Sequence, residues 1–181
     1  MKLNRNEFRN YIHSYEDDEL FYRDLYLAEK EHPETFMEYC KHLDPDYITS
    51  HKLFVPALRR EAWFPYLEES DMFCNLTGNI MLCKHYRYSP VYVHEHEFFE
   101  ILCVYDGTVH TTIQGISHTL TTGDICIIPP HTKHSVGVFD DSIAVNILVR
   151  SSTFQSTFFQ TLTADSSLAQ FFAHVLFHKT E

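Results

Sequence analysis

The chain has 181 residues, of which 44% are hydrophobic and 15% aromatic, and its formal net charge at pH 7 is -11. This length and composition predict one folded domain with helical flanks and argue against a disordered chain. Residues 1 to 70 and the remainder are both acidic, which argues against a nucleic-acid-binding surface on the chain itself, because phosphate contacts need clustered lysine and arginine.

The cysteines favour a reducing compartment. No Cys-x-x-Cys pair occurs, and an odd number suits free thiols better than a disulfide framework. The first seven residues contain no apolar stretch that could act as a signal peptide, and no apolar run approaches membrane-spanning length. We therefore expect a cytoplasmic protein with no membrane partner. The five cysteines are Cys40, Cys74, Cys83, Cys103 and Cys126.

Residues 1–75 are predicted to form a helical N-terminal segment. Apolar residues recur at helical spacing over 19–28 and again over 36–43. Pro33 is predicted at the first turn of the second helix. A third helix is expected over 57–67, although Pro65 interrupts it. The aromatic residues of this segment are expected to pack against the following domain.

Residues 76–150 show the spacing of short strands joined by tight turns. Gly78-Asn79, Gln114-Gly115 and Thr122-Gly123 supply turn signals. Such a series predicts a mainly β fold, an antiparallel sandwich or barrel. The expected strands are 80–86, 98–105, 108–113, 116–120, 125–128, 134–139 and 143–149.

Residues 151–181 return to helical spacing. Phe154, Phe158 and Leu162 lie four apart, and 165–167 resembles a helix N-cap region. A second helix then carries an apolar stripe that is too hydrophobic to face water. Its partner is either the chain's own barrel or the same helix of a second subunit. The stripe consists of Leu168, Phe171, Phe172, Val175 and Leu176.

The rest of the chain is organised around residues 93–107, read as a strand that ends in a type I′ hairpin turn at Asp106-Gly107. Alternate residues of a strand share a face. His94, His96 and Glu100 should therefore project from one side. Leu102 and Val104 continue that side as an apolar floor, which is the layout of a metal or small-molecule pocket.

A second stretch, 123–134, completes the site with His134. Together the two stretches resemble the paired motifs of the cupin superfamily, which implies a double-stranded β-helix, or jelly roll. His94, His96, Glu100 and Gly107 fit the first motif without a gap, and Gly123, Pro129 and His134 fit the second. Three framework positions depart from the motifs, namely Tyr88, His131 and Val138.

The resemblance implies that His94, His96, Glu100 and His134 are metal ligands. Three imidazoles and a carboxylate suit a divalent transition metal, whose identity geometry alone does not choose. The alternative is a metal-free pocket whose polar residues bind a ligand or one another.

Residues 96–101, 123–130 and 134–135, with the helices that follow, resemble the sensing half of AraC-type bacterial transcription regulators. The resemblance implies a small-molecule effector bound in the barrel by His94, His96, Glu100, Leu102, Val104 and His134, and no catalytic residue. It also favours a homodimer through the C-terminal helices. DNA would be bound only by helix-turn-helix motifs that this sequence lacks, so we expect it to end at a domain boundary or to be a stand-alone sensor.

Two alternatives remain open. One is a small metal-dependent cupin enzyme, either a dioxygenase or an isomerase, which the complete ligand set favours. No cluster of basic residues for an anionic substrate lies near the motifs. The other is an interaction module without a ligand.

Overall fold

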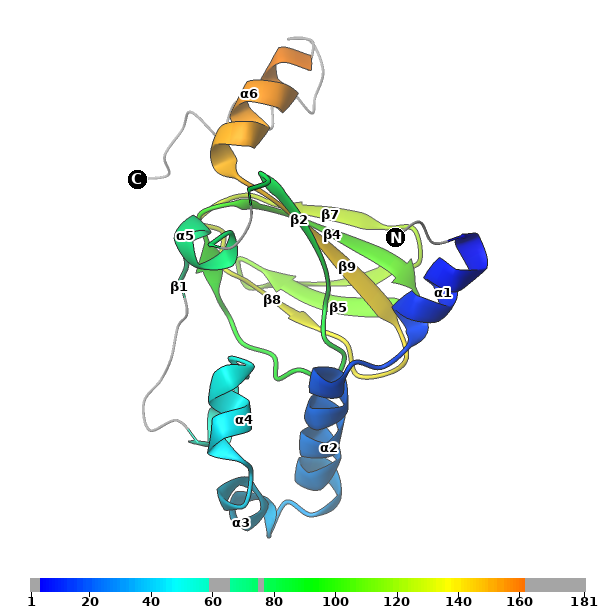
Figure 1. The fold of residues 1–181 in the computed structure, drawn as a ribbon, viewed down its shortest axis with the longest axis vertical. Helices are drawn as coiled ribbons and strands as arrows, with labels where there is room; N and C mark the ends of the chain where they lie inside the picture. Colours follow the sequence, from blue (N-terminus) through cyan, green and yellow to red (C-terminus); the bar gives the residue numbers. More distant parts are fainter. Residues whose placement is uncertain (1–3, 59–65, 75–76, 162–181) are drawn as a thin grey trace.

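The computed structural model describes residues 4–58, 66–74 and 77–161 (Figure 1). A β-barrel occupies the centre, and the N-terminal helices α2, α3 and α4 extend from it on one side. Helix α6, Ser151–Thr161, lies at the opposite end of the molecule and runs away from the barrel.

The N-terminal segment is helical as predicted, and side chains cap the start of two of its short helices. Asn4 and Glu7 form a capping box on the first helix, and Asp44 caps the helix that starts with Pro45. The elements are α1 Arg5–His13, α2 Asp17–Glu31, α3 Phe36–Lys41, α4 Pro45–Ser50, the 3-10 turn η1 Pro56–Leu58, β1 Tyr66–Leu67 and α5 Glu69–Met72.

Seven of the eight strands after residue 77 form two antiparallel sheets. One sheet has the order β2-β9-β4-β7 and the other β6-β5-β8. These strands are β2 Ile80–Lys84, β4 Phe99–Asp106, β5 Thr108–Ile113, β6 Ile116–Thr121, β7 Ile125–Ile128, β8 His134–Gly137 and β9 Ile143–Val149. The predicted antiparallel cupin-type barrel is confirmed, and the strand bounds agree with the pattern to within a few residues.

The hairpin predicted at Asp106-Gly107 is wrong. Strand β4 pairs with β7 and β9, whereas β5 pairs with β6 and β8, so this turn is a corner between the two sheets. Gly107 has φ 80°, and a side chain there would collide with Ser142. The two-residue hairpin with positive φ at both positions is Gln114-Gly115, which joins β5 to β6.

Two elements of the N-terminal segment differ from the prediction. The turn at Pro33 precedes the third helix, which begins only at Phe36. Instead of a helix reaching residue 67, Tyr66–Leu67 forms a strand that pairs in parallel with β3, Glu95–His96. A two-residue strand has no periodicity of its own, and its pairing is set by tertiary contacts.

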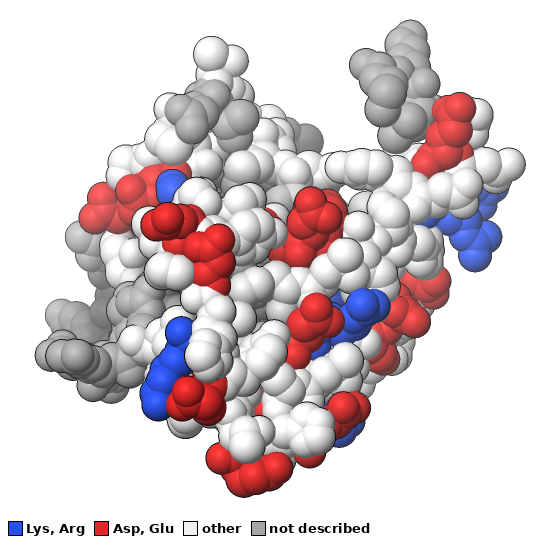
Figure 2. All heavy atoms as spheres, turned by 60° about the horizontal axis from the view of Figure 1, so that its bottom comes forward, with Lys and Arg blue, Asp and Glu red and all other residues white. Residues whose placement is uncertain are grey.

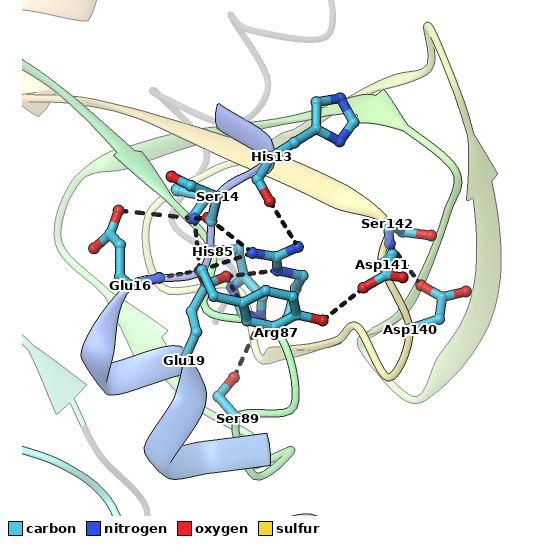
Figure 3. A network of polar contacts seen from close by, with 12 residues as sticks. His13, Ser14, Glu16, Glu19, His85, Arg87, Ser89, Asp140, Asp141 and Ser142 are labelled. Atoms are coloured by element: carbon cyan, nitrogen blue, oxygen red, sulfur yellow. Dashed lines mark hydrogen bonds and ion pairs between the residues drawn. The ribbon is translucent and has the colours of Figure 1, made fainter. Parts of the chain in front are cut away.

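A buried charge network attaches α2 to the barrel (Figure 3). The Glu19 carboxylate, which is fully buried, lies 2.9 Å from Arg87 Nε and 2.6 Å from Lys84 Nζ. Arg87 also donates to the carbonyls of His13 and Ser14, which close the end of α1. Hydrogen bonds from Arg87 and Lys84 lower the pKa of Glu19 although burial raises it.

Helix α6 packs onto the barrel through Phe154. Its ring stacks on Phe99 of β4 with ring centroids 3.8 Å apart and an interplanar angle of 10°. The apolar stripe expected at 168–176 lies outside the described residues, so the homodimer through it stays a prediction.

Figure 2 shows acidic side chains across the face that carries the N-terminal helices, with lysine and arginine side chains in small groups between them. Within the described part of the chain, no helix has both the length and the apolar character needed to cross a membrane.

Candidate functional site

Two histidines of the predicted site are joined by their backbones. The N–H of His94 donates to the carbonyl of His134, and the N–H of His134 donates back to His94, each over 2.9 Å. Their ring centroids are 4.1 Å apart. A reciprocal pair of this kind holds the two backbones side by side and so keeps both rings close together.

Glu100 and His96 complete the cluster. The Glu100 carboxylate, on β4, lies 3.3 Å from His96 Nε2 and 3.6 Å from His134 Nε2. His96 is fully buried and stacks on Phe98 with centroids 4.3 Å apart. The structure thus brings together all four polar residues that the two motifs indicate.

The hydrogen bonds of the histidines leave their Nε2 atoms available. His134 Nδ1 donates to the Thr132 carbonyl at 2.8 Å, and His94 Nδ1 donates to the Tyr92 carbonyl at 3.3 Å, because a carbonyl can only accept. The protons therefore lie on Nδ1 in the neutral rings. Burial, together with the charge of His134, lowers the pKa of His94 to about 4.

Glu100 is held as a carboxylate. Burial raises its pKa, but the adjacent imidazoles of His134 and His96 outweigh burial and bring the pKa well below its usual range. A buried carboxylate beside two Nε2 lone pairs is an electron-rich centre that favours a cation.

These residues fit a divalent metal ion. Ligand atoms of His94, Glu100 and His134 all lie within 4.8 Å of one another. Both Nδ1–H groups already donate to backbone carbonyls, which is how metal-binding histidines are commonly oriented. His96 Nδ1 and His134 Nε2 are buried and accept or donate no hydrogen bond among the described residues. His96 lies next to the group formed by His94, Glu100 and His134, with its Nε2 atom 3.3 Å from the Glu100 carboxylate.

Leu102 and Val104 face inward as predicted but lie deeper than the polar cluster. Leu102 and Val104 are 0% and 3% exposed, and they pack in an apolar core with Val109, Val136 and Val138. They support the strand that carries Glu100 and are absent from the cavity wall, because β4 continues past the cavity toward the sheet corner.

A cavity of about 550 Å³ opens beside the cluster, with His94 and Glu100 in its wall. This volume lies in the range of about 300–1,000 Å³ that is usual for small-molecule sites. The barrel contributes Cys83, His85 and Asn146. Asn146 Oδ1 is buried and has no hydrogen-bond partner among the described residues, so it is available to a ligand.

The N-terminal segment forms part of the same wall, so the barrel alone does not enclose the cavity. Tyr22 of α2 and residues 51–54 line the cavity. The Tyr22 hydroxyl accepts the N–H of Phe54 at 2.9 Å, and the Phe54 ring meets Tyr92 edge to face. No sequence pattern links these residues to strands β2 and β9. The sequence therefore predicted neither Asn146 nor the N-terminal segment as part of the cavity wall.

The fold and the site define a barrel built to bind a small molecule or metal ion in its interior. The chain belongs to the family of AraC-like ligand binding domains, whose model matches residues 80–178. This match covers the barrel and leaves the N-terminal helices outside it.

Among curated proteins, the chain is similar to the HTH-type transcriptional activator RhaS from Yersinia pestis (strain Pestoides F) and Yersinia pseudotuberculosis (serotype O:1b, strain IP 31758). Each match is 27% identical over 85 residues, which is 47% of this chain and 31% of that protein. The chain therefore spans about a third of the length of these relatives.

Solved structures with similarity include KdgF from Halomonas sp., with TM-score 0.37, 25% identity, and coverage of 40% of this chain and 71% of that one. A cupin protein from Bacteroides fragilis has TM-score 0.36, 21% identity, and coverage of 52% and 84%.

Proposed function

We propose that this chain senses a small-molecule effector for an AraC-type transcription regulator, binding it in the cavity between the barrel and residues 51–54. Membership of the ligand-binding family supports a sensing role. The observation that carries the proposal is a cavity of about 550 Å³ bordered by the unpartnered Asn146 amide oxygen and the Glu100 carboxylate.

The proposal extends to the partners of the whole regulator. In this proposal DNA is contacted by a separate helix-turn-helix part, as the name of the RhaS relatives indicates for those proteins. A regulator of this type acts in the cytoplasm. The homodimer through residues 151–181 remains one of two alternatives for the C-terminal stripe.

We also propose that His94, Glu100 and His134 bind a divalent transition metal, with His96 beside them. The ion would supply a positive centre at the cavity wall for an oxygen or nitrogen atom of the effector. Protein purified without chelator should carry about one equivalent of metal by elemental analysis, and His134→Ala should abolish it. Thr132→Ala, which keeps the carbonyl that orients His134, is the control. Equal metal content in His134→Ala and Thr132→Ala would contradict metal binding at this site.

The competing function is a small metal-dependent cupin enzyme, which the same polar cluster favours. The two functions differ in the fate of the bound molecule. A sensor releases its effector unchanged, whereas an enzyme converts it.

A thermal-shift screen of small metabolites tests the sensing function. A molecule that raises the melting temperature should bind at least tenfold more weakly to Asn146→Ala, which is about 1.4 kcal/mol. Asn79→Ala, an exposed position, serves as the control. Recovery of the bound molecule by mass spectrometry then decides its fate. Conversion to product would establish the enzyme, and equal affinity for Asn146→Ala would place the site elsewhere.

A further inference from the structure

A second cleft, of about 380 Å³, lies between helix α1 and the end of strand β4. It shares no lining residue with the effector cavity. Its volume falls within the range of about 300–1,000 Å³ that is usual for small-molecule sites. Helix α1 contributes Arg5, Asn6, Arg9 and His13 to its wall, and β4 contributes Tyr105 and Asp106.

This α1–β4 cleft holds two arginines without acidic partners. Arg5 and Arg9 are exposed, and neither forms an ion pair or a side-chain hydrogen bond within the described part of the chain. The other described arginines, Arg23, Arg87 and Arg150, each lie within 4.0 Å of a carboxylate. A chain with a formal net charge of -11 is rich in acidic side chains, so two arginines without one make this cleft locally positive.

The positions of these two arginines are unfavourable for the helix itself. Arg5 and Arg9 are one turn apart and share a face, so their like charges repel one another. Arg5 is also the first residue of α1, where the helix dipole disfavours a cation. An anion bound between the two guanidinium groups would offset both effects. Natural sequences break such local preferences mainly at functional sites.

Two contacts fix α1 to the barrel, so the cleft is formed before a ligand binds. At the C-terminal end of α1, Arg87 donates to the carbonyls of His13 and Ser14 over 3.4 and 3.0 Å (Figure 3). In the middle of the helix, the Phe8 ring meets Tyr105 edge to face with centroids 6.0 Å apart. A ligand in the cleft therefore need not order the helix, which favours binding.

Asp106 is the acidic residue in the wall of this cleft, and it lies at the end away from the arginines. Its carboxylate is 3.6 Å from His13 Nε2, a buried atom with no hydrogen-bond partner among the described residues. Along α1, Arg9 is about 6 Å and Arg5 about 12 Å from His13. The negative charge therefore sits beside His13, and the other end of the cleft is positive.

We propose that this cleft binds the phosphate monoester group of a small molecule between Arg5 and Arg9. Guanidinium groups form paired hydrogen bonds with phosphate oxygens. One arginine balances a carboxylate, whereas a phosphate monoester carries nearly two negative charges above pH 7 and matches both arginines. Asn6 adds an amide donor, and the Tyr105 ring offers an apolar wall for the rest of the molecule. This site is separate from the effector cavity and goes beyond the proposed sensing function.

Phenyl phosphate is a suitable probe because it joins a phosphate monoester to a small apolar body. Isothermal titration calorimetry of the whole chain above pH 7, with chelator present to keep metal ions from the phosphate, should detect its binding. Arg9→Gln should weaken binding at least tenfold. Arg9→Lys, which keeps the charge but not the guanidinium fork, should lose less. Lys41→Gln removes the same charge from another exposed helix and should leave the affinity unchanged.

Two comparisons separate this site from other anion binding. Benzenesulfonate has the same ring and a tetrahedral oxyanion but a single charge, and it should bind at least tenfold more weakly than phenyl phosphate. Asn146→Ala, in the effector cavity, should leave phenyl phosphate binding unchanged. The two sites can therefore fail independently.

Three results overturn the proposal. Phenyl phosphate that does not bind the parent at millimolar concentration would show that the cleft is not a site. Equal affinity of the parent and Arg9→Gln would place any bound phosphate elsewhere. Equal binding of benzenesulfonate would contradict recognition of a dianion. Because Arg9 is exposed, its substitution does not threaten the fold, and circular dichroism of each variant checks this.

Discussion

Gly107 is needed at the sheet corner for two physical reasons. Its φ of 80° lies in the left-handed region, and Ser142 occupies the space that a side chain would need. Gly115 has a similar φ of 82° but no atom within 4 Å of an added side chain. The two glycines therefore separate backbone strain from steric collision.

Gly107→Ala should destabilise the fold by about 2–4 kcal/mol, and Gly115→Ala by about 1 kcal/mol, because only the first adds a collision to the strain. Urea denaturation of both variants measures the difference. Equal losses of unfolding free energy in the two variants would show that Ser142 moves aside without an energetic penalty.

His85 makes stability depend on pH. It lies in the cavity wall, and burial lowers its pKa. The unfolded chain therefore takes up a proton that the folded chain does not as the pH falls below about 6.5, so this residue reduces stability on acidification. His85→Gln should lose less stability between pH 7 and pH 5 than the parent.

The measurement for His85 is urea denaturation at a series of pH values, with chelator present to remove metal effects. His118→Gln, at an exposed position, is the control and should follow the parent. An unchanged pH slope in His85→Gln would show that the side chain is not held neutral by the fold.

At the scale of elements, α2 depends on a charge cluster that water does not reach. Glu19→Gln would leave Lys84 and Arg87 buried without their shared carboxylate, and loss of one partner of a buried pair costs about 3–5 kcal/mol. Glu29→Gln, exposed on the same helix, should cost under about 0.5 kcal/mol. Denaturant midpoints compare the two, and similar losses would mean that water screens the Glu19 pair.

The strands could be predicted well because β-branched and aromatic runs alternate with turn residues, as in 108–113 and 116–121. The pairing of β1 with β3 could not, since two residues carry no period and the contact spans a long sequence separation. The Asp106-Gly107 turn was misassigned because the same dipeptide suits a hairpin and a corner between sheets.

At the scale of the whole molecule, motif spacing was enough to group His94, His96, Glu100 and His134. The single strand predicted over residues 93–107 is wrong, because the chain forms two strands there, β3 and β4, and His94 precedes both. The remaining cavity wall comes from β2, β9 and the N-terminal segment, which meet only in the folded chain. Helical periodicity identified α2 but gave no indication that its Tyr22 reaches the cavity.

The proposed division at residues 75 and 76 can be tested by removing the N-terminal segment. A fragment of residues 76–181 would expose Arg87 and Lys84 and lose the wall formed by Tyr22 and residues 51–54. We expect it to bind effector at least tenfold more weakly and to unfold at a lower temperature. Circular dichroism and the thermal-shift assay measure both. Unchanged affinity would show that residues 76–150 hold the whole site.

The two-part cavity wall has a consequence for how selectivity can change. Residues 51–54 lie outside the stretch that matches the family; Leu53 is buried in the core of the N-terminal segment, whereas Phe54 meets Tyr92 in the cavity wall. Substitutions there reshape one side of the cavity without repacking the interior of either sheet. Related chains could thus acquire new chemical signals by exchanging this short loop while keeping an unaltered barrel.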